Sequence, residues 1–231
     1  MGKAKMFKIN SINSFPNVYQ NTHYTNPNMI NHEGVELDMK GKWKSEVFKN
    51  DNPIVLELAC GKGDYALALA RRYPNKNFVG VDSKGARIFT GSKTALDEGL
   101  TNVAFARFKI ENILNYFAAG EVDEIWITFP DPFPKLRDAK RRLSAPKFLE
   151  RYRQIAKPGA VLHFKTDDLP LHLFTKEMAQ EFSPEILYCK EDIYSTPLQY
   201  DELSIQTYYE KKHLAEGRTI NYIRFLLSKA E

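Results

Sequence analysis

The sequence predicts a doubly wound α/β domain with a mostly parallel, seven-stranded sheet and helices on both faces. From residue 54 onward, short apolar runs rich in β-branched and aromatic residues alternate with longer amphipathic stretches. This alternation is typical of βαβ units, whose strands pair in parallel. A glycine-containing turn directly after the first apolar run indicates a ligand site at the carboxyl end of the sheet.

Seven strands and four helices are expected in order along residues 54–227. The strands are expected at 54–59, 77–82, 103–108, 124–129, 160–166, 185–190 and 220–227, and the helices near 64–73, 85–98, 145–156 and 169–182. A loop and a short helix separate the last two apolar runs. They are therefore expected to close the sheet as a hairpin-like pair.

The first 40 residues have a different composition, rich in Asn and interrupted by two prolines, with no sustained hydrophobic period. We expect a poorly packed basic arm over 1–40, followed by a single domain over 41–231. Its Lys3, Lys5 and Lys8 suit a phosphate backbone, although a solubilising terminus is the more common use of such a segment.

Composition excludes several classes of protein. With 43% hydrophobic, 13% aromatic and 27% charged residues, the 231-residue chain is neither disordered nor collagen-like. It contains no apolar run of membrane-spanning length and no signal-peptide core, so we expect a soluble, cytoplasmic protein. Cys60 and Cys189 cannot form a disulfide framework, the five histidines lack metal-ligand spacing, and no metal is expected.

The glycine turn follows the predicted strand at 54–59. Gly61 and Gly63 allow positive φ angles and remove Cβ atoms, so the backbone can approach a ligand closely. The pattern Gly61-x-Gly63-x-x-Ala66 also satisfies the dinucleotide fingerprint, with Asp82 placed as the ribose-binding carboxylate. The turn alone is therefore compatible with an NAD-dependent oxidoreductase.

Glu57 favours a different ligand. A carboxylate beside the turn suits a cationic or amine-bearing ligand better than a pyrophosphate, and S-adenosylmethionine carries both an amine and a sulfonium. Asp82 would accept hydrogen bonds from both hydroxyls of its ribose. No Lys, His or Tyr pair is recognisably placed for hydride chemistry. The alternative is a tight βα turn in which Glu57 only caps a neighbour.

The predicted strand at 124–129 runs directly into Pro130-Asp131-Pro132-Phe133-Pro134-Lys135. Prolines fix φ and favour extended conformations before them, so Asp131 is expected to be held stiffly at the mouth of the sheet. The following segment, 135–153, carries eight Lys or Arg against Asp138 and Glu150. We interpret it as a grip on a phosphate backbone. The competing interpretation is a solvated surface.

The order of these motifs resembles the tRNA (guanine-N7)-methyltransferase family of class I, Rossmann-like methyltransferases. The resemblance covers about residues 50–227 and rests on four segments: Glu57-x-x-Cys60-Gly61-x-Gly63, Pro130 to Lys135 with its basic tail, Phe164-Lys165-Thr166-Asp167, and Thr207-Tyr208-Tyr209-Glu210. The Pro-Asp-Pro segment is the most specific. The chain departs from the family in having Phe133 where Trp is usual and a less continuously basic tail.

The resemblance implies methyl transfer from S-adenosylmethionine to N7 of a guanine in the variable loop of tRNA, at tRNA position 46. It implies three sets of site residues: cofactor contacts at Glu57, Gly61, Gly63, Asp82, Asn112 and Asp131; substrate contacts at Lys135, Asp167, Thr207 and Glu210; and RNA contacts at Arg137, Lys140, Arg141 and Arg142. Tyrosines 194, 200, 208 and 209 suit either base stacking or packing.

Some of these assignments have alternatives. Glu111 would replace Asn112 after a one-residue slip. Thr207 and Glu210 have the spacing of a capping box, and Asp168 is expected to cap the helix near 169. The partner would be tRNA, with the protein a monomer or homodimer. An inactive RNA-binding protein of the same fold is the remaining alternative.

Methylation of N7 needs no obligatory general base, because N7 carries an unprotonated lone pair. Positioning and electrostatics must then supply the rate. Asp131 is the expected catalytic residue, either offsetting the positive charge that grows on guanine or accepting hydrogen bonds from its N1 and N2 groups.

Overall fold

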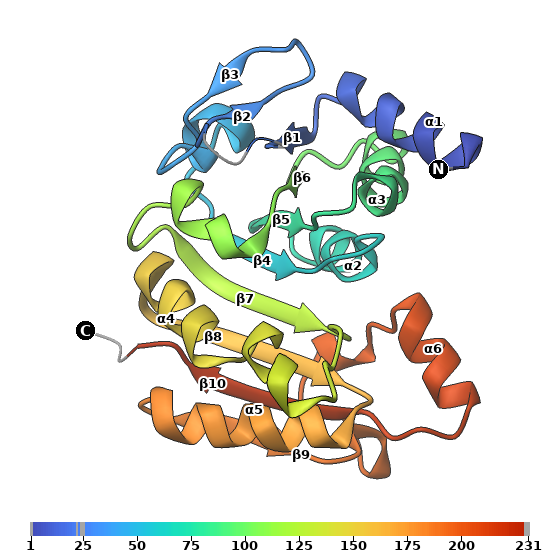
Figure 1. Cartoon of the computed structure of the whole chain (residues 1–231), viewed down its shortest axis with the longest axis vertical. Helices are drawn as coiled ribbons and strands as arrows, with labels where there is room; N and C mark the ends of the chain where they lie inside the picture. Colours follow the sequence, from blue (N-terminus) through green and yellow to red (C-terminus); the bar gives the residue numbers. More distant parts are fainter. Residues whose placement is uncertain (1, 22, 24–25, 229–231) are drawn as a thin grey trace.

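The computed structural model describes residues 2–21, 23 and 26–228, and Figure 1 shows the whole chain. The strands are β1 (Val18–Gln20), β2 (Met29–Ile30), β3 (Glu36–Leu37), β4 (Ile54–Leu58), β5 (Asn77–Val81), β6 (Val103–Arg107), β7 (Val122–Thr128), β8 (Ala156–Thr166), β9 (Ile186–Lys190) and β10 (Asn221–Leu226). The α-helices are α1 (Lys3–Ser11), α2 (Asp64–Arg72), α3 (Gly85–Asp97), α4 (Pro146–Ile155), α5 (Leu169–Phe182) and α6 (Tyr208–Ala215).

The described strands form one sheet in the order β3-β2-β1-β6-β5-β4-β7-β8-β10-β9. Strands β1, β6, β5, β4, β7 and β8 pair in parallel, and β10 runs antiparallel between β8 and β9. Strand β4 lies between β5 and β7, so the strand order reverses there. In doubly wound sheets, ligands bind at the carboxyl ends of strands beside such a reversal.

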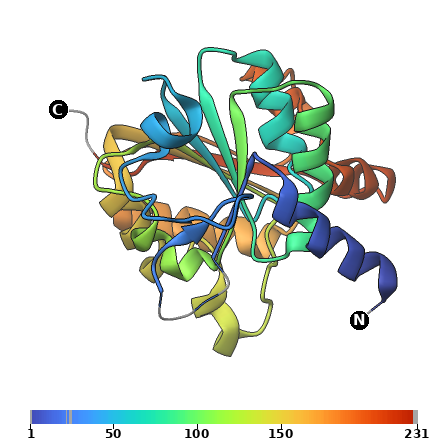
Figure 2. The same cartoon turned by 90° about the horizontal axis from the view of Figure 1, so that it is seen from above.

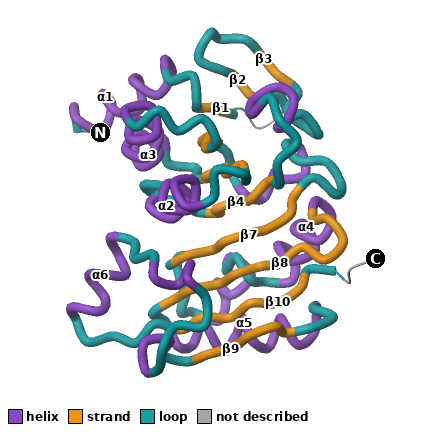
Figure 3. The backbone as a smooth tube through the Cα atoms, turned by 180° about the vertical axis from the view of Figure 1, so that it is seen from behind, coloured by secondary structure: helices purple, strands orange, loops and turns teal. Residues whose placement is uncertain are grey.

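Helices cover both faces of the sheet (Figure 2), and side-chain alternation along β4 divides the core into two layers. Ile54, Leu56 and Leu58 pack in the cluster that includes the buried residues of α4 and α5. Val55 packs with α2 and α3, which lie on the opposite face (Figure 3). Because alternate side chains share a face, Glu57 belongs to the α2 layer, and its contact with α2 is described below.

The predicted fold class and the seven strands from residue 54 onward are confirmed, and the last two of them, β9 and β10, do pair antiparallel as predicted. The total of seven strands is wrong, since β1, β2 and β3 extend the sheet. The described residues of 1–40 are also better packed than predicted. Tyr19, Met29 and Met39 are buried in the core, and β1 pairs with β6. Strands of two or three residues are too short to show a hydrophobic period, which explains the error.

The ends of the predicted ranges, residues 1 and 229–231, lie outside the described residues. Within the described part, no helix combines the length and apolarity needed to cross a membrane. No three His, Cys, Asp or Glu side chains of that part are grouped so as to hold a metal ion.

Candidate active site

Asp82, just after β5, is a buried carboxylate that closes the glycine turn. Its side chain is 5% exposed, and its two oxygens accept hydrogen bonds from Gly61 N at 3.1 Å and Lys84 N at 2.7 Å. Desolvation raises the pKa of Asp82, while these hydrogen bonds and the charge of Arg87 oppose the rise. Each oxygen keeps a free lone pair for a further donor.

Glu57 is the second buried carboxylate, on the neighbouring strand. It is 3% exposed and accepts hydrogen bonds from Ala66 N at 2.8 Å and the Thr128 hydroxyl at 3.3 Å. Burial, reinforced by the nearby Asp64 and Asp82, raises the pKa of Glu57 to about 8. A group with this pKa ionises readily when a cation comes close.

The two glycines of the turn serve different purposes. Gly61 has φ +57°, and a Cβ added there would meet nothing within 4 Å, so its backbone borders open space. Gly63 has φ +73°, and an added Cβ would lie 2.5 Å from Phe105 Cε1. Gly63 is therefore required by packing, whereas Gly61 leaves room for a ligand.

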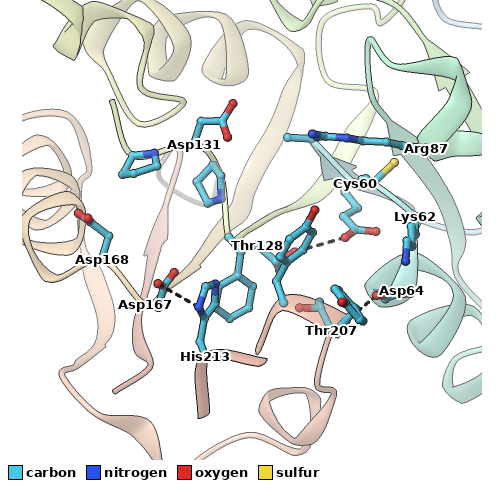
Figure 4. A pocket seen from close by; sticks show the side chains of 18 of the residues that line it. Cys60, Lys62, Asp64, Arg87, Thr128, Asp131, Asp167, Asp168, Thr207 and His213 are labelled. Atoms are coloured by element: carbon cyan, nitrogen blue, oxygen red, sulfur yellow. Dashed lines mark hydrogen bonds and ion pairs between the residues drawn. The ribbon is translucent and has the colours of Figure 1, made fainter. Parts of the chain in front are cut away.

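A cavity lies at the carboxyl ends of β4, β7 and β8 (Figure 4). On one side is the glycine-turn wall, defined as residues 57–66 together with Asp82, which itself lines the adjoining cavity described next. Across it is the proline-loop wall, residues 130–135, and Thr207 to His213 of the α6 segment close the third side. A second cavity adjoins the first, with Asp82 and Glu111 in its lining. Asp131 lines both cavities, so it lies where they meet.

Asp131 itself is exposed and, within the described residues, makes no hydrogen bond or ion pair. The backbone around it is strained, because Phe129 and Phe133 adopt left-handed φ angles of 51° and 44°. Non-glycine residues rarely adopt such angles, and they cluster at functional sites. Asp131 is thus an unpartnered carboxylate at the mouth of the sheet, presented by a loop with two strained residues.

Asp167 faces the cavity from the end of β8. One of its oxygens accepts a hydrogen bond from Arg218 at 2.8 Å, and His213 Nδ1 lies 3.5 Å from the same oxygen. The sequence reasoning missed Arg218 and His213, since neither belongs to a motif. Asp168 accepts a hydrogen bond from Leu171 N at 2.7 Å and caps α5, which confirms that prediction.

Thr207 and Glu210 were predicted either to contact the substrate or to cap a helix, and the structure places their side chains differently. The Thr207 hydroxyl accepts a hydrogen bond from Glu210 N at 3.1 Å, so Thr207 caps α6 and also lines the cavity. The Glu210 carboxylate lies behind the cavity wall, fully buried. It pairs with the fully buried Lys165 at 2.6 Å and accepts a hydrogen bond from Tyr194 at 2.7 Å. The structure therefore makes Glu210 an anchor between β8 and α6.

The basic tail is not uniform. Arg137, Lys140 and Arg141 are exposed, as a phosphate grip requires. Arg142 is only 9% exposed and donates to the carbonyls of Pro132 and Phe133, both at 3.1 Å. The prediction that Arg142 contacts RNA does not match this position, because sequence reveals the charge of an arginine but not its burial.

Glu111 and Asn112 were alternative candidates for the same cofactor contact, and they line different cavities. Glu111 lines the cavity that contains Asp82, whereas Asn112 lines a neighbouring one with Asn21 and Arg107. The structure therefore places Glu111, and not Asn112, in the same cavity lining as Asp82. Lys135 is exposed at the end of the proline-loop wall, outside the lining of both cavities.

Comparison with known proteins agrees with this geometry. Residues 51–223 match the family described as "Putative methyltransferase". The chain is 45% identical to a tRNA (guanine-N(7)-)-methyltransferase of Bacteroides fragilis (strain YCH46), over 98% of this chain and 87% of that protein. A Christiangramia forsetii enzyme of the same name is 50% identical, over 82% of this chain and 85% of that one.

The chain belongs to the tRNA (guanine-N(7)-)-methyltransferase family. Solved structures agree on the fold of this methyltransferase. The 16S rRNA methyltransferase KamB has a TM-score of 0.64 at 14% identity, covering 84% of this chain and 96% of that one. An antibiotic-related methyltransferase has a TM-score of 0.60 at 20% identity, covering 82% and 94%. The oxidoreductase alternative is not favoured by these findings.

Proposed function

We propose that this chain transfers a methyl group from S-adenosylmethionine to N7 of a guanine in the variable loop of tRNA. The observation that carries the proposal is the position of Asp131 where two cavities meet. Across the first cavity it faces the buried Glu57 and the open glycine Gly61, and the adjoining cavity brings it together with the buried Asp82. The names of the relatives support tRNA as the substrate.

The glycine-turn wall fits S-adenosylmethionine. The open space at Gly61 accommodates a bulky ligand beside the backbone. Asp82 would accept hydrogen bonds from the ribose hydroxyls with the lone pairs that its two backbone donors leave free. Glu57, with its pKa near 8, would ionise beside the cationic end of the ligand. When bound, the ligand supplies an electrophilic methyl group on a sulfonium.

Asp131 acts on the substrate. Because N7 attacks with its own lone pair, no residue has to remove a proton before transfer. Asp131 makes no bond in the described structure that would have to break. Its carboxylate is therefore available to offset the positive charge that appears on guanine, which is the contribution expected of a preorganised electrostatic group.

The residues that contact the guanosine and the tRNA phosphates are assigned from their positions in the cavity lining and on the surface. Asp167 and Thr207 line the cavity and would contact the guanosine, with Asp167 exchanging its bond to Arg218 for one to the base. Lys135, Arg137, Lys140 and Arg141 are exposed beside the proline-loop wall and would bind tRNA phosphates.

The test is identification of the product. Purified protein is incubated with S-adenosylmethionine and an unmodified tRNA transcript, and the digested RNA is analysed by mass spectrometry for N7-methylguanosine. A matched transcript with 7-deazaguanine at the variable-loop guanine should yield no product, because it lacks N7. Methylation of both transcripts would show a different target atom. Binding of the transcript without any methylation would favour the inactive RNA-binding alternative.

A further inference from the structure

Arg142 is buried against the loop that carries Asp131. Its Nε donates to the Pro132 carbonyl and its Nη2 to the Phe133 carbonyl, both at 3.1 Å. Within the described residues it has no carboxylate partner, so these two carbonyls and an aromatic ring surround its charge. The charge is thus used inside the protein and is not presented to solvent.

The proline-loop wall has few other ways to hold its shape. Pro130, Pro132 and Pro134 lack N–H groups and cannot donate backbone hydrogen bonds. Among the described residues, the two bonds from Arg142 are the hydrogen bonds that reach 130–134. Phe133, one of their two acceptors, is also the residue with φ 44°. Without Arg142, the strained Phe133 would lose its hydrogen-bonded anchor and keep only the contact of its ring with the Arg141 guanidinium, 4.3 Å away.

Arg142 is itself fixed from α5. Its guanidinium lies 4.6 Å from the centre of the Phe174 ring, and two residues further along the chain the Ser144 hydroxyl is 2.8 Å from that of Thr175. A chain of contacts therefore runs from α5 through Arg142 to the loop backbone.

We propose that Arg142 is a positioning residue, which sets the place of the Asp131 carboxylate by holding the carbonyls of Pro132 and Phe133, and that it does not bind tRNA phosphates. The proposal rests on the proposed function, since Asp131 is its catalytic residue. The proposal gives Arg142 a different role from Arg137, Lys140 and Arg141. The charge pattern of the sequence alone assigns all four residues to RNA binding.

The principal variant is Arg142→Lys, which keeps the charge but cannot make both bonds of the planar fork. We expect kcat for tRNA methylation to fall about 10- to 100-fold, because a displacement of the order of 1 Å in a catalytic group costs about that much. The matched control is Arg71→Lys on α2, since Arg71 makes two bonds of 2.7 Å to Glu98 far from the site. This control should keep the wild-type kcat.

A double-mutant cycle separates positioning from general damage to the fold. If Arg142 acts through Asp131, then Arg142→Lys should lower kcat by less than about threefold when Asp131 is already Asn, because coupled residues are non-additive. An equal loss in both backgrounds would overturn the proposal. So would a wild-type kcat in Arg142→Lys.

Salt dependence tests the competing role. For Arg142→Gln, the slope of log tRNA affinity against log salt should equal that of the wild type. Arg137→Gln should reduce it by about 0.7 to 0.9, the value for one released counterion. A reduced slope in Arg142→Gln would make it a phosphate contact.

Carbonyl chemical shifts give a readout that does not depend on activity. The bonds from Arg142 end on the carbonyls of Pro132 and Phe133, so the carbonyl ¹³C resonances of these two residues report on the bonds directly. Both resonances should shift in Arg142→Lys and stay unchanged in Arg71→Lys. If the wild type methylates no tRNA, the proposed function fails while this measurement still decides whether Arg142 holds the loop. Unchanged carbonyl shifts in Arg142→Lys would overturn the positioning role.

Discussion

The glycine-turn wall and the proline-loop wall face each other across one cavity, but different contacts hold them. In the glycine-turn wall the carboxylates Glu57 and Asp82 are buried and accept hydrogen bonds mainly from backbone donors of the turns beside them. In the proline-loop wall Asp131 is exposed, and the carbonyls that follow it accept hydrogen bonds from an arginine of the next segment.

This difference separates two kinds of function. The carboxylates of the glycine-turn wall are held by local backbone hydrogen bonds, so this wall is preformed, which suits a cofactor that binds in the same way in every cycle. The proline-loop wall presents the unpartnered carboxylate of Asp131, which suits a group that interacts only with bound substrate. Changes in the first wall should therefore affect cofactor binding and stability, and changes in the second should affect turnover.

The largest effect is expected for Asp131→Asn, which keeps the side-chain shape and removes the charge. If the carboxylate stabilises charge on guanine, kcat and kcat/KM should both fall about 100- to 1000-fold, with little change in cofactor affinity measured by calorimetry. A rise in KM for tRNA at constant kcat would mean that Asp131 only orients the base. Unchanged kinetics in a folded variant would remove it from the catalytic machinery.

The two glycines give a matched pair within the other wall. Gly63→Ala adds a Cβ 2.5 Å from Phe105 at a positive φ, so the free energy of unfolding should fall by about 2 to 5 kcal/mol. Gly61→Ala carries only the backbone strain, about 1 to 2 kcal/mol, because its added Cβ meets no atom. Urea denaturation measures both, and calorimetry should show weaker S-adenosylmethionine binding in Gly61→Ala. Equal destabilisation would contradict this division of roles.

A smaller, pH-dependent effect is expected at Glu57. Its pKa is raised to about 8 in the folded protein, chiefly by burial, so the folded chain holds a proton that the unfolded chain has lost. The free energy of unfolding should therefore fall as pH rises toward 8, by about 1 kcal/mol per pH unit from this group. Glu57→Gln removes the titration and should flatten the curve between pH 5 and 8. Parallel curves in urea titrations would show that Glu57 is already ionised.

The sequence predicted the glycine-turn wall better than the proline-loop wall. Glu57, Gly61 and Gly63 belong to one contiguous strand and turn, so their local pattern already fixes their arrangement, and Asp82 follows at the end of the next strand. Arg142 owes its role to burial and Arg218 to its tertiary contact with Asp167, neither of which residue type reveals.

In the fold, too, the sequence predicted the elements with a local pattern and missed those that depend on tertiary contacts. Strands β4 to β7 follow their β-branched runs to within about two residues. Strand β8 begins at Ala156, four residues before the predicted start, because it follows α4 without a loop. Strands β1 to β3 gain their structure by pairing with the sheet, and their own residues carry no signal of it.

The pairing of β1 with β6 also protects the molecule from self-association. Without Val18–Gln20, the backbone groups of β6 would form an open strand edge, which readily pairs with another chain. The strand that ends the sheet beyond β1 is instead β3, only two residues long. A chain trimmed to residues 41–231 would expose the edge of β6. It would also expose the apolar side chains that Tyr19 and Met29 now cover. The N-terminal segment thus serves as a cover against aggregation, and a shortened protein would need a substitute for it.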